Sequence, residues 1–337
     1  MSAERGTIPE PASPADRPRM TLSEVQTLAR NIRGEVAKAI VGQEPLVDML
    51  LVAMISEGHV LLEGPPGTAK TFLAQAFSTA LGLDYGRIQF TPDLLPGDIV
   101  GSNLFNFQTS QFTLTRGPIF CELLLADEIN RTPPKTQAAL LEAMQERRVT
   151  LDGETHALPP RFMVVATQNP IENQGVYPLP EAQLDRFLFK LLTPYPDAEE
   201  EAQIVRTFGQ RSGPQRPADL GVEAVADTNT LLAASAALND VGVADEIADY
   251  VVRLVRATRD HPELSVGASP RAGVLLANAA RARAALDGRD YTIPDDVKAL
   301  AIAVLRHRLT LSPAAEIEGR DVEALVGELV EQTEAPR

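Results

Sequence analysis

A loop that begins at Gly64 has the residue types needed to bind a phosphate chain. It follows an apolar run at residues 59–63 and precedes a helical pattern at residues 70–81. Small residues let backbone N–H groups approach phosphate oxygens, and a helix N-terminus adds a favourable dipole. Lys70 is suited to the β- and γ-phosphates, and the Thr71 hydroxyl to Mg²⁺. The predicted phosphate-binding residues are Gly64, Pro65, Pro66, Gly67, Thr68, Ala69, Lys70 and Thr71.

Ala69 departs from the general pattern of such loops, which have glycine immediately before the lysine. We expect the chain to be turning into the helix at this position, with a negative φ that admits alanine. The alternative for the whole loop is a plain Gly/Pro turn between a strand and a helix. The acidic and polar residues described next favour the phosphate site, because they supply its remaining chemistry.

Carboxylates and an amide follow two further apolar runs, at residues 119–126 and 161–167. Asp127 could hold Mg²⁺ through its water shell, and Glu128 could polarise an attacking water as general base. Asn169 could position the water against the γ-phosphate. The alternatives are a solvated strand end for the two acids and a turn residue before Pro170 for the asparagine. A strand of this kind delivers its terminal acid to the sheet edge that carries the phosphate loop.

Two arginines could stabilise the charge that develops during phosphoryl transfer. Arg186 lies in the sequence Leu184 to Phe187, and Arg271 follows Ser269 and Pro270. A guanidinium matches the equatorial oxygens of a phosphoryl group bidentately. For either arginine alone, a surface salt bridge is the default interpretation.

The elements that position these residues alternate between strand and helix. Short apolar runs at residues 59–63, 87–90, 119–126, 161–167 and 187–192 predict strands, and residues 70–81 and 134–145 predict helices. Alternation of this kind predicts a doubly wound α/β layer with a parallel sheet. Before it, Thr21 and Glu24 form a capping-box pattern for a helix that ends near residue 39, and a second helix is expected at residues 44–57.

Two segments do not fit a plain α/β unit. Residues 103–115 alternate apolar and polar side chains and predict a hairpin inserted before the third strand. Residues 148–160 contain Asp152 and Gly153, a strong hairpin turn signal, and predict a second hairpin before the fourth strand.

The composition changes at about residue 196, where the chain becomes rich in alanine, acidic and helical in period. Helices are expected at residues 198–208, 228–239, 244–259, 270–286 and 294–307. The chain is therefore predicted to consist of a disordered tail at residues 1–19, a nucleotide-binding α/β domain at 20–195 and a smaller all-helical linker and lid at 196–337.

The composition also limits the classes of partner. The 337-residue chain has a formal net charge of −15, which disfavours general binding to nucleic acid or to a membrane surface. The single cysteine, Cys121, lies in an apolar run and is expected to be a buried core thiol. The N-terminus has no apolar signal-peptide region, and no apolar stretch is long enough to cross a bilayer, so a cytoplasmic location is expected.

Taken together, these motifs resemble those of the AAA+ ATPases, and more narrowly those of the MoxR group in the clade with an insert in helix 2. The resemblance extends from about residue 21 to the C-terminal region, and alanine before the lysine is itself usual in this group. The matching motifs are Val41-Gly42-Gln43, the loop from Gly64 to Thr71, Asp127 to Arg131, Ala166 to Pro170, Leu179 to Phe187 and Ser269 to Arg271.

The resemblance implies a P-loop AAA+ αβα core with a five-stranded parallel sheet and a helical C-terminal lid. It implies ATP hydrolysis with Mg²⁺. Lys70 and Thr71 match the Walker A pair, Asp127 and Glu128 match Walker B, and Asn169 matches sensor 1.

Further roles follow from the resemblance alone. Val41, Gly42 and Gln43 would lie near the adenine. Arg186 matches an arginine finger that acts on the nucleotide of the neighbouring subunit, and Arg271 matches sensor 2 on the lid. ATP would then bind between the α/β domain and the lid, and a finger acting in trans requires a homo-oligomer, commonly a hexameric ring. Arg131 matches the MoxR pattern, with a subunit contact as a plausible role.

The implied biological role is a chaperone-like machine that remodels or matures a client protein, often with a partner that carries a von Willebrand factor A domain. In related proteins both hairpins face the ring pore or the client. Two other classes of function stay open. One is a motor that translocates nucleic acid, which the net charge disfavours. The other is a nucleotide-gated scaffold with little turnover, which Glu128 and Arg186 disfavour.

Overall fold

The computed structural model describes residues 19–106, 111–170, 176–210, 213 and 215–336. At its centre is one sheet of five parallel strands in the order β2-β5-β8-β1-β9. The predicted parallel sheet is therefore confirmed, and the predicted tail at residues 1–19 lies outside the described residues except for Arg19. The strands are β1 (Val60–Glu63), β2 (Tyr85–Gln89), β5 (Leu123–Asp127), β8 (Met163–Gln168) and β9 (Phe189–Leu192).

Helices cover both faces of this sheet. Successive side chains of a strand point to opposite faces, so Val60 and Leu62 enter one apolar core while Leu61 enters the other. The same alternation buries every residue of β5, and it explains why the central strands are apolar throughout. Cys121 is 4% exposed in the second core, as expected for a core thiol. The covering helices are α1 (Leu22–Ala37), α2 (Glu44–Ile55), α3 (Lys70–Leu81), α4 (Pro96–Val100) and α5 (Pro134–Glu146).

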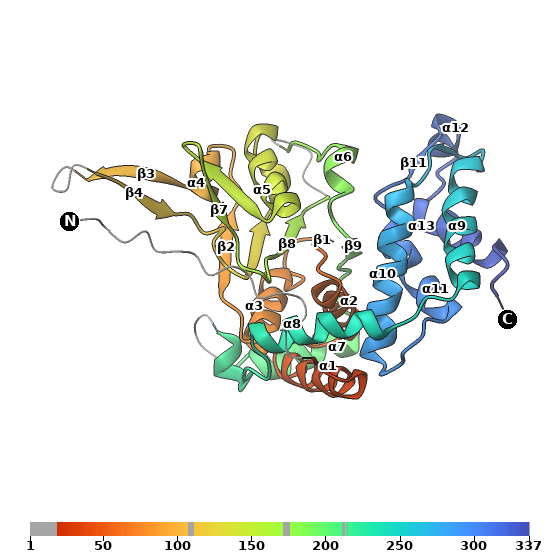
Figure 1. Cartoon of the computed structure of the whole chain (residues 1–337), viewed down its shortest axis with the longest axis horizontal. Coiled ribbons are helices and arrows are strands. Elements are labelled where there is room, and N and C mark those ends of the chain that lie inside the picture. Colours follow the sequence, from red (N-terminus) through yellow and green to blue (C-terminus); the bar gives the residue numbers. More distant parts are fainter. Residues whose placement is uncertain (1–18, 107–110, 171–175, 211–212, 214, 337) are drawn as a thin grey trace.

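The two predicted hairpins are present and lie next to each other. The first consists of β3 (Gly101–Asn106) and β4 (Gln111–Arg116) and extends from the core at the left of Figure 1. The second consists of β6 (Arg148–Leu151) and β7 (Glu154–Ala157), which are joined by Asp152 and Gly153, both with positive φ. Asn103 Nδ2 donates a hydrogen bond of 2.8 Å to Asp152 Oδ2, so the turn of one hairpin is tied to a strand of the other.

The C-terminal part of the chain divides between the core and a separate lid (Figure 1). Residues 217–240 pack against the α/β layer: Val225 N donates to Ala80 O, and Ser235 Oγ donates to Ile55 O. The lid begins at α9, and its α10 packs against α1 and α2. The predicted domain boundary between residues 195 and 196 stays a prediction. The elements after β9 are α7 (Ala198–Phe208), η3 (Pro217–Leu220), α8 (Thr228–Ala236), η4 (Ala237–Asp240), α9 (Asp245–Asp260), β10 (Leu264–Val266), α10 (Pro270–Leu286), α11 (Pro294–Leu305), β11 (Thr310–Leu311), α12 (Pro313–Ile317) and α13 (Val322–Gln332).

The lid is helical, as predicted, but it also contains one short antiparallel pair, β10 with β11. Strands of three and two residues are too short to show a period in the sequence. In the part of the chain that the structure describes, no helix has the length and apolar composition of a membrane span.

A buried histidine joins the α/β layer at the start of β1. His59 Nδ1 accepts a hydrogen bond of 3.0 Å from Val164 N, and its Nε2 lies 3.1 Å from Met144 O. Nδ1 can accept only while the ring is neutral. Burial, reinforced by the charge of Arg147, lowers the pKa of His59 to about 3. The folded protein therefore holds this imidazole in its neutral form.

The unfolded chain binds a proton at His59 below pH 6.5, whereas the folded chain does so only near pH 3. Stability should therefore fall as the pH drops below 6.5, and His59 should contribute a loss of about 2 kcal/mol between pH 6.5 and 5. Urea denaturation across this range should show a shallower pH slope for His59→Gln than for wild type. His261→Gln is the control, and an equal slope in wild type and His59→Gln would contradict the prediction.

Candidate nucleotide site

The phosphate loop connects β1 to the first turn of α3, as the sequence predicts. Gly67 has a φ of 84°, in the region that favours glycine, so the loop can turn without steric cost. Gly64 has the backbone of Thr193 against it, where a side chain would collide. Within the loop the Thr68 hydroxyl donates to Pro65 O at 3.0 Å. These features fix a tight loop at the carboxyl end of β1.

The expected negative φ at Ala69 is wrong. Ala69 is the N-cap of α3 and has φ 58° and ψ 20°, in the left-handed region. Alanine carries a steric cost here that glycine would not, because its Cβ crowds the backbone. The chain has not yet entered the helix at residue 69. Helical geometry begins at Lys70, where the predicted helix at residues 70–81 starts.

Lys70 folds back over its own loop. Its Nζ donates to Gly64 O at 2.9 Å and to Pro65 O at 2.7 Å, and it lies 3.2 Å from Thr68 Oγ1. Burial lowers the pKa of Lys70, and the charges of Asp127 and Glu128 oppose this shift. The ammonium group is thus held at the mouth of the loop and faces the two carboxylates.

Asp127 ends β5 beside the first turn of α3. Its Oδ2 accepts from Thr71 Oγ1 at 3.3 Å and from Arg87 Nη2 at 2.6 Å, and its Oδ1 accepts from Thr167 Oγ1 at 2.7 Å. A threonine hydroxyl and one carboxylate at this distance fit Mg²⁺, which takes few protein ligands and completes its shell with phosphates and water. The residues present therefore suit the predicted metal.

Glu128 is held by two side chains that the sequence does not predict as its partners. Its Oε2 accepts from Gln89 Nε2 at 2.8 Å and pairs with Arg131 Nε at 3.1 Å. Its backbone has φ 57°, and its N–H donates to Thr167 Oγ1 at 2.9 Å. Thr167 thus fixes Asp127 and Glu128 together. The structure gives Arg131 a contact within the chain, with the Glu128 carboxylate.

These groups share one cavity of about 370 Å³ at the carboxyl edge of the sheet. The structure therefore brings together the loop, both carboxylates and Asn169, which come from β1, β5 and β8. Sequence reasoning missed Arg87 and Gln89, because each belongs to a strand and has no motif of its own, and it gave no role to Thr167 within the motif from Ala166 to Pro170. The predicted site residues that line the cavity are Pro66, Gly67, Thr68, Ala69, Lys70, Thr71, Asp127, Glu128 and Asn169.

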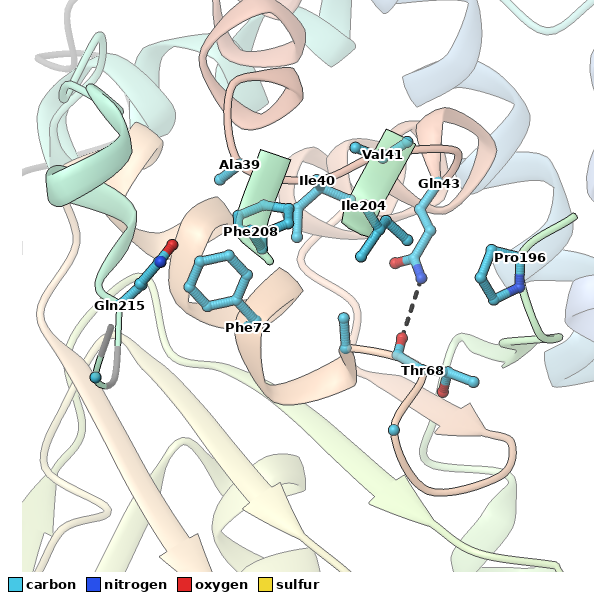
Figure 2. Close-up of a pocket in the computed structure, with 13 residues that line it drawn as sticks. Ala39, Ile40, Val41, Gln43, Thr68, Phe72, Pro196, Ile204, Phe208 and Gln215 are labelled. Carbon is cyan, nitrogen blue, oxygen red and sulfur yellow. Dashed lines mark hydrogen bonds between the residues drawn. The ribbon is translucent and has the colours of Figure 1, made fainter. Parts of the chain in front are cut away.

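A second cavity of about 440 Å³ continues from the loop toward α7 (Figure 2). Val41 and Gln43, which are predicted to lie near the adenine, line this cavity, and Gly42 lies between them with φ 73°. Its other walls are mostly apolar and suit the face of an aromatic base. Sequence reasoning missed these walls, which come from Ala39, Ile40, Phe72, Pro196, Ile204 and Phe208.

The polar groups of this cavity fit adenine. Gln43 Nε2 donates to Thr68 O at 3.0 Å, which fixes the orientation of the amide (Figure 2). Gln43 Oε1 and Gln215 Oε1 are buried without a hydrogen-bond partner among the described residues. An exocyclic amino group supplies the donor that such buried acceptors require. The two adjoining cavities therefore accommodate a base and its phosphates.

Neither predicted arginine lines these two cavities. Arg186 precedes β9 and Arg271 lies in the first turn of α10, and both line a different cavity of about 220 Å³. That cavity is at the opposite edge of the sheet, since it also includes Glu57, Gly58 and His59, which precede β1. No residue of α9–α13 lines the base and phosphate cavities within the described chain. The residues after 195 that do line the base cavity are Pro196, Ile204, Phe208, Gly213 and Gln215, so binding of ATP between the α/β domain and the lid stays a prediction.

Comparisons with known proteins agree with this geometry. Residues 59–189 match the family model "ATPase family associated with various cellular activities (AAA)", and residues 256–329 match the AAA lid domain. The chain is 44% identical to Chaperone MoxR1 of Mycobacterium tuberculosis, covering 94% of this chain and 84% of that protein. It is 31% identical to Protein MoxR of Methylorubrum extorquens, covering 94% and 97%. The chain belongs to the MoxR family of AAA ATPases.

A solved structure shows the same fold. A crystal structure of a Cytophaga hutchinsonii protein superposes with a TM-score of 0.86 at 36% identity, and the match covers 94% of this chain and 97% of that one. Membership of the MoxR family makes the chain an ATP-binding ATPase, and AAA proteins of this kind are typically oligomeric.

The left-handed backbone at Ala69 predicts how this MoxR-family loop responds to substitution. Ala69→Gly should keep nucleotide affinity, because glycine adopts positive φ freely. Ala69→Val should weaken it about tenfold or more, because a β-branched residue at positive φ forces the loop to rearrange. Titration with a fluorescent ADP analogue measures both. Equal affinity in the two variants would show that the loop binds nucleotide with a negative φ at this position.

The fixed amide of Gln43 predicts base selectivity. Gln43→Met keeps the volume but removes the acceptor, so ATP affinity should fall about tenfold, with a smaller change for GTP. Competition of ATP and GTP against a fluorescent ADP analogue gives the ratio of the two affinities. An unchanged ratio would mean that Gln43 only supports the phosphate loop through Thr68.

Proposed function

We propose that the chain forms a ring, commonly a hexamer, in which Arg186 of one subunit completes the ATP site of its neighbour. The observation that carries this proposal is the lack of a partner for the Arg186 side chain within the described residues. Among the described residues its side chain has no ion-pair or hydrogen-bond partner, although it lies beside Asp185, which pairs with two other arginines. An arginine left unpaired in this way is available to an anion from outside the chain.

The direction of the sheet supports action in trans. β9 runs parallel to β1, with Phe189 level with Val60. Arg186 lies before the start of β9, whereas Lys70 lies beyond the end of β1. Along the strand direction the two residues are therefore separated by at least the length of one strand, about 13 Å. A finger at one edge and a phosphate loop at the other meet when subunits pack edge to edge. Arg271 shares the cavity of Arg186 and would reach the same neighbouring site.

At that site the side chains of this chain have separate tasks. Lys70 exchanges loop carbonyls for the β- and γ-phosphates, and Asn169 orients the water. Glu128 leaves Gln89 and Arg131 to take the proton of that water. Mg²⁺, held by Thr71 and Asp127, would neutralise charge on the phosphates. Arg186 then stabilises the negative charge that grows on the transferred phosphoryl group.

We propose that ATP hydrolysis drives the remodelling of a client protein in the cytoplasm. The relative MoxR1 of Mycobacterium tuberculosis is named a chaperone, which supports this proposal. The two hairpins, joined through Asn103 and Asp152, form one projecting unit that could transmit motion to a client. A partner with a von Willebrand factor A domain fits the family resemblance.

The decisive experiment measures phosphate release from ATP over a range of protein concentrations. Wild-type activity per subunit should rise with concentration, because the site is complete only in the assembly. Arg186→Ala should lose about 100-fold or more in kcat while its affinity for a fluorescent ADP analogue stays near wild type.

Arg206→Ala provides the matched control, since Arg206 is exposed on α7 and does not line the cavity of Arg186 and Arg271. A flat activity per subunit together with a neutral Arg186→Ala would refute the finger in trans.

A further inference from the structure

A buried lid arginine is bonded to the segment that carries Arg186. Arg308 follows α11, and its side chain is only 2% exposed. Its Nε donates to Asp185 Oδ1 at 2.7 Å, and its Nη2 donates to Asp185 O at 3.0 Å and to Phe187 O at 2.7 Å. Its Nη1 donates to Leu188 O at 3.2 Å and also to Val304 O. The turn between α6 (Glu181–Leu184) and β9 is thus bonded to the lid through the residues immediately before and after Arg186.

The chemistry of this contact requires arginine. A guanidinium has five N–H groups in a fixed plane, and Arg308 directs them at five acceptors. Three of the acceptors are backbone carbonyls of residues 185, 187 and 188, so the path of the chain itself is fixed. Lysine could satisfy at most three acceptors and would leave buried carbonyls unpaired.

A second lid residue contacts the same turn. His307 Nε2 lies 3.0 Å from Phe187 O and 2.8 Å from Arg308 Nη1. Burial and the neighbouring Arg308 charge lower the pKa of His307 well below its usual value, so the ring is neutral. Arg271, also from the lid, approaches the Asp185 carboxylate at 3.6 Å. Lid groups therefore engage the residues on both sides of Arg186, while the Arg186 side chain itself has no partner among the described residues.

We propose that Arg308 is a positioning residue for the arginine finger, so that the lid of one subunit sets how its Arg186 is presented to the neighbouring ATP site. This inference rests on the proposed function, because it takes Arg186 to act in trans. A rotation of the lid moves the turn with it, since the turn is bonded to the end of α11. Phosphoryl transfer is sensitive to displacements of about 1 Å in such groups. Lid orientation in one subunit would therefore control hydrolysis in the next.

The test uses full-length protein and two measurements. Arg308→Lys should lower kcat at least about tenfold, with KM and the affinity for a fluorescent ADP analogue within about twofold of wild type, because its own nucleotide site is intact. Arg320→Lys is the control: Arg320 joins lid groups Glu263 at 2.6 Å and Glu328 at 2.8 Å and does not contact the turn.

Mixed assemblies separate positioning from a general defect. Lys70→Ala subunits cannot use ATP but carry normal fingers. Mixed with Arg308→Lys subunits, they should restore hydrolysis well above the sum of the separate activities, as they should with Arg186→Ala subunits. Restoration in both mixtures supports the proposal. Restoration with Arg186→Ala alone overturns it and leaves the finger in trans intact, whereas restoration in neither overturns the finger in trans itself.

The kcat values of two variants also test whether Arg308 positions the finger. An Arg308→Lys variant with wild-type kcat overturns the proposal. If thermal melting shows that Arg308→Lys does not fold, Asp185→Ala replaces it, since it removes the carboxylate but keeps the backbone carbonyls that Arg308 contacts. Asp185→Ala should then show a lowered kcat that Lys70→Ala subunits restore, and wild-type kcat in Asp185→Ala would overturn the proposal.

Discussion

All five strands of the central sheet run in one direction, and this places the two halves of the predicted site at opposite edges. The carboxyl ends of β1, β5 and β8 supply the loop, the carboxylates and Asn169. The segment before β9 supplies Arg186, and the lid adds Arg271 beside it. No side-chain rearrangement within one subunit can bring the halves together across the length of a strand. In the ring that we propose, the topology of the fold would therefore couple hydrolysis to assembly.

Lys70 and the two carboxylates of the phosphate cavity each have a partner within the chain. Lys70 is bonded to loop carbonyls, Asp127 to Arg87, and Glu128 to Gln89 and Arg131. The ion pair between Arg87 and Asp127 joins a side chain that is 45% exposed, and such pairs contribute only about 0–1 kcal/mol. A bound triphosphate can exchange these contacts at small cost. The pairs keep the side chains in place without holding them too tightly to act.

The sequence predicts the parts of this site that are local in the chain. Lys70, Asp127 and Asn169 sit in motifs next to apolar strands, so their types and neighbours suffice to place them. Arg87 and Gln89 meet the carboxylates only because β2 pairs with β5, and that pairing leaves no sequence pattern. Arg308 is 123 residues from Asp185 in the chain, and a charged residue after a helix gives no sign in the sequence of this contact. The wrong prediction of a negative φ at Ala69 has a different cause, because the type of a residue gives only a preference for φ and does not determine it.

Non-glycine residues with positive φ occur at both edges of the sheet. The described residues include five non-glycine positions with positive φ: Glu57, Ala69, Glu128, Arg147 and Asp152. Ala69 and Glu128 line the phosphate cavity, whereas Glu57 and Arg147 line the cavity of Arg186 and Arg271. Asp152 lies in a hairpin turn that requires this conformation. Positive φ costs about 1–2 kcal/mol for a residue with a Cβ, so surrounding contacts must hold it. Glu57 and Arg147 lie at the C-terminal ends of α2 and α5, where a left-handed residue commonly ends a helix. Only the positive φ of Ala69 and Glu128 therefore indicates that backbone stability is given up to place groups around a nucleotide.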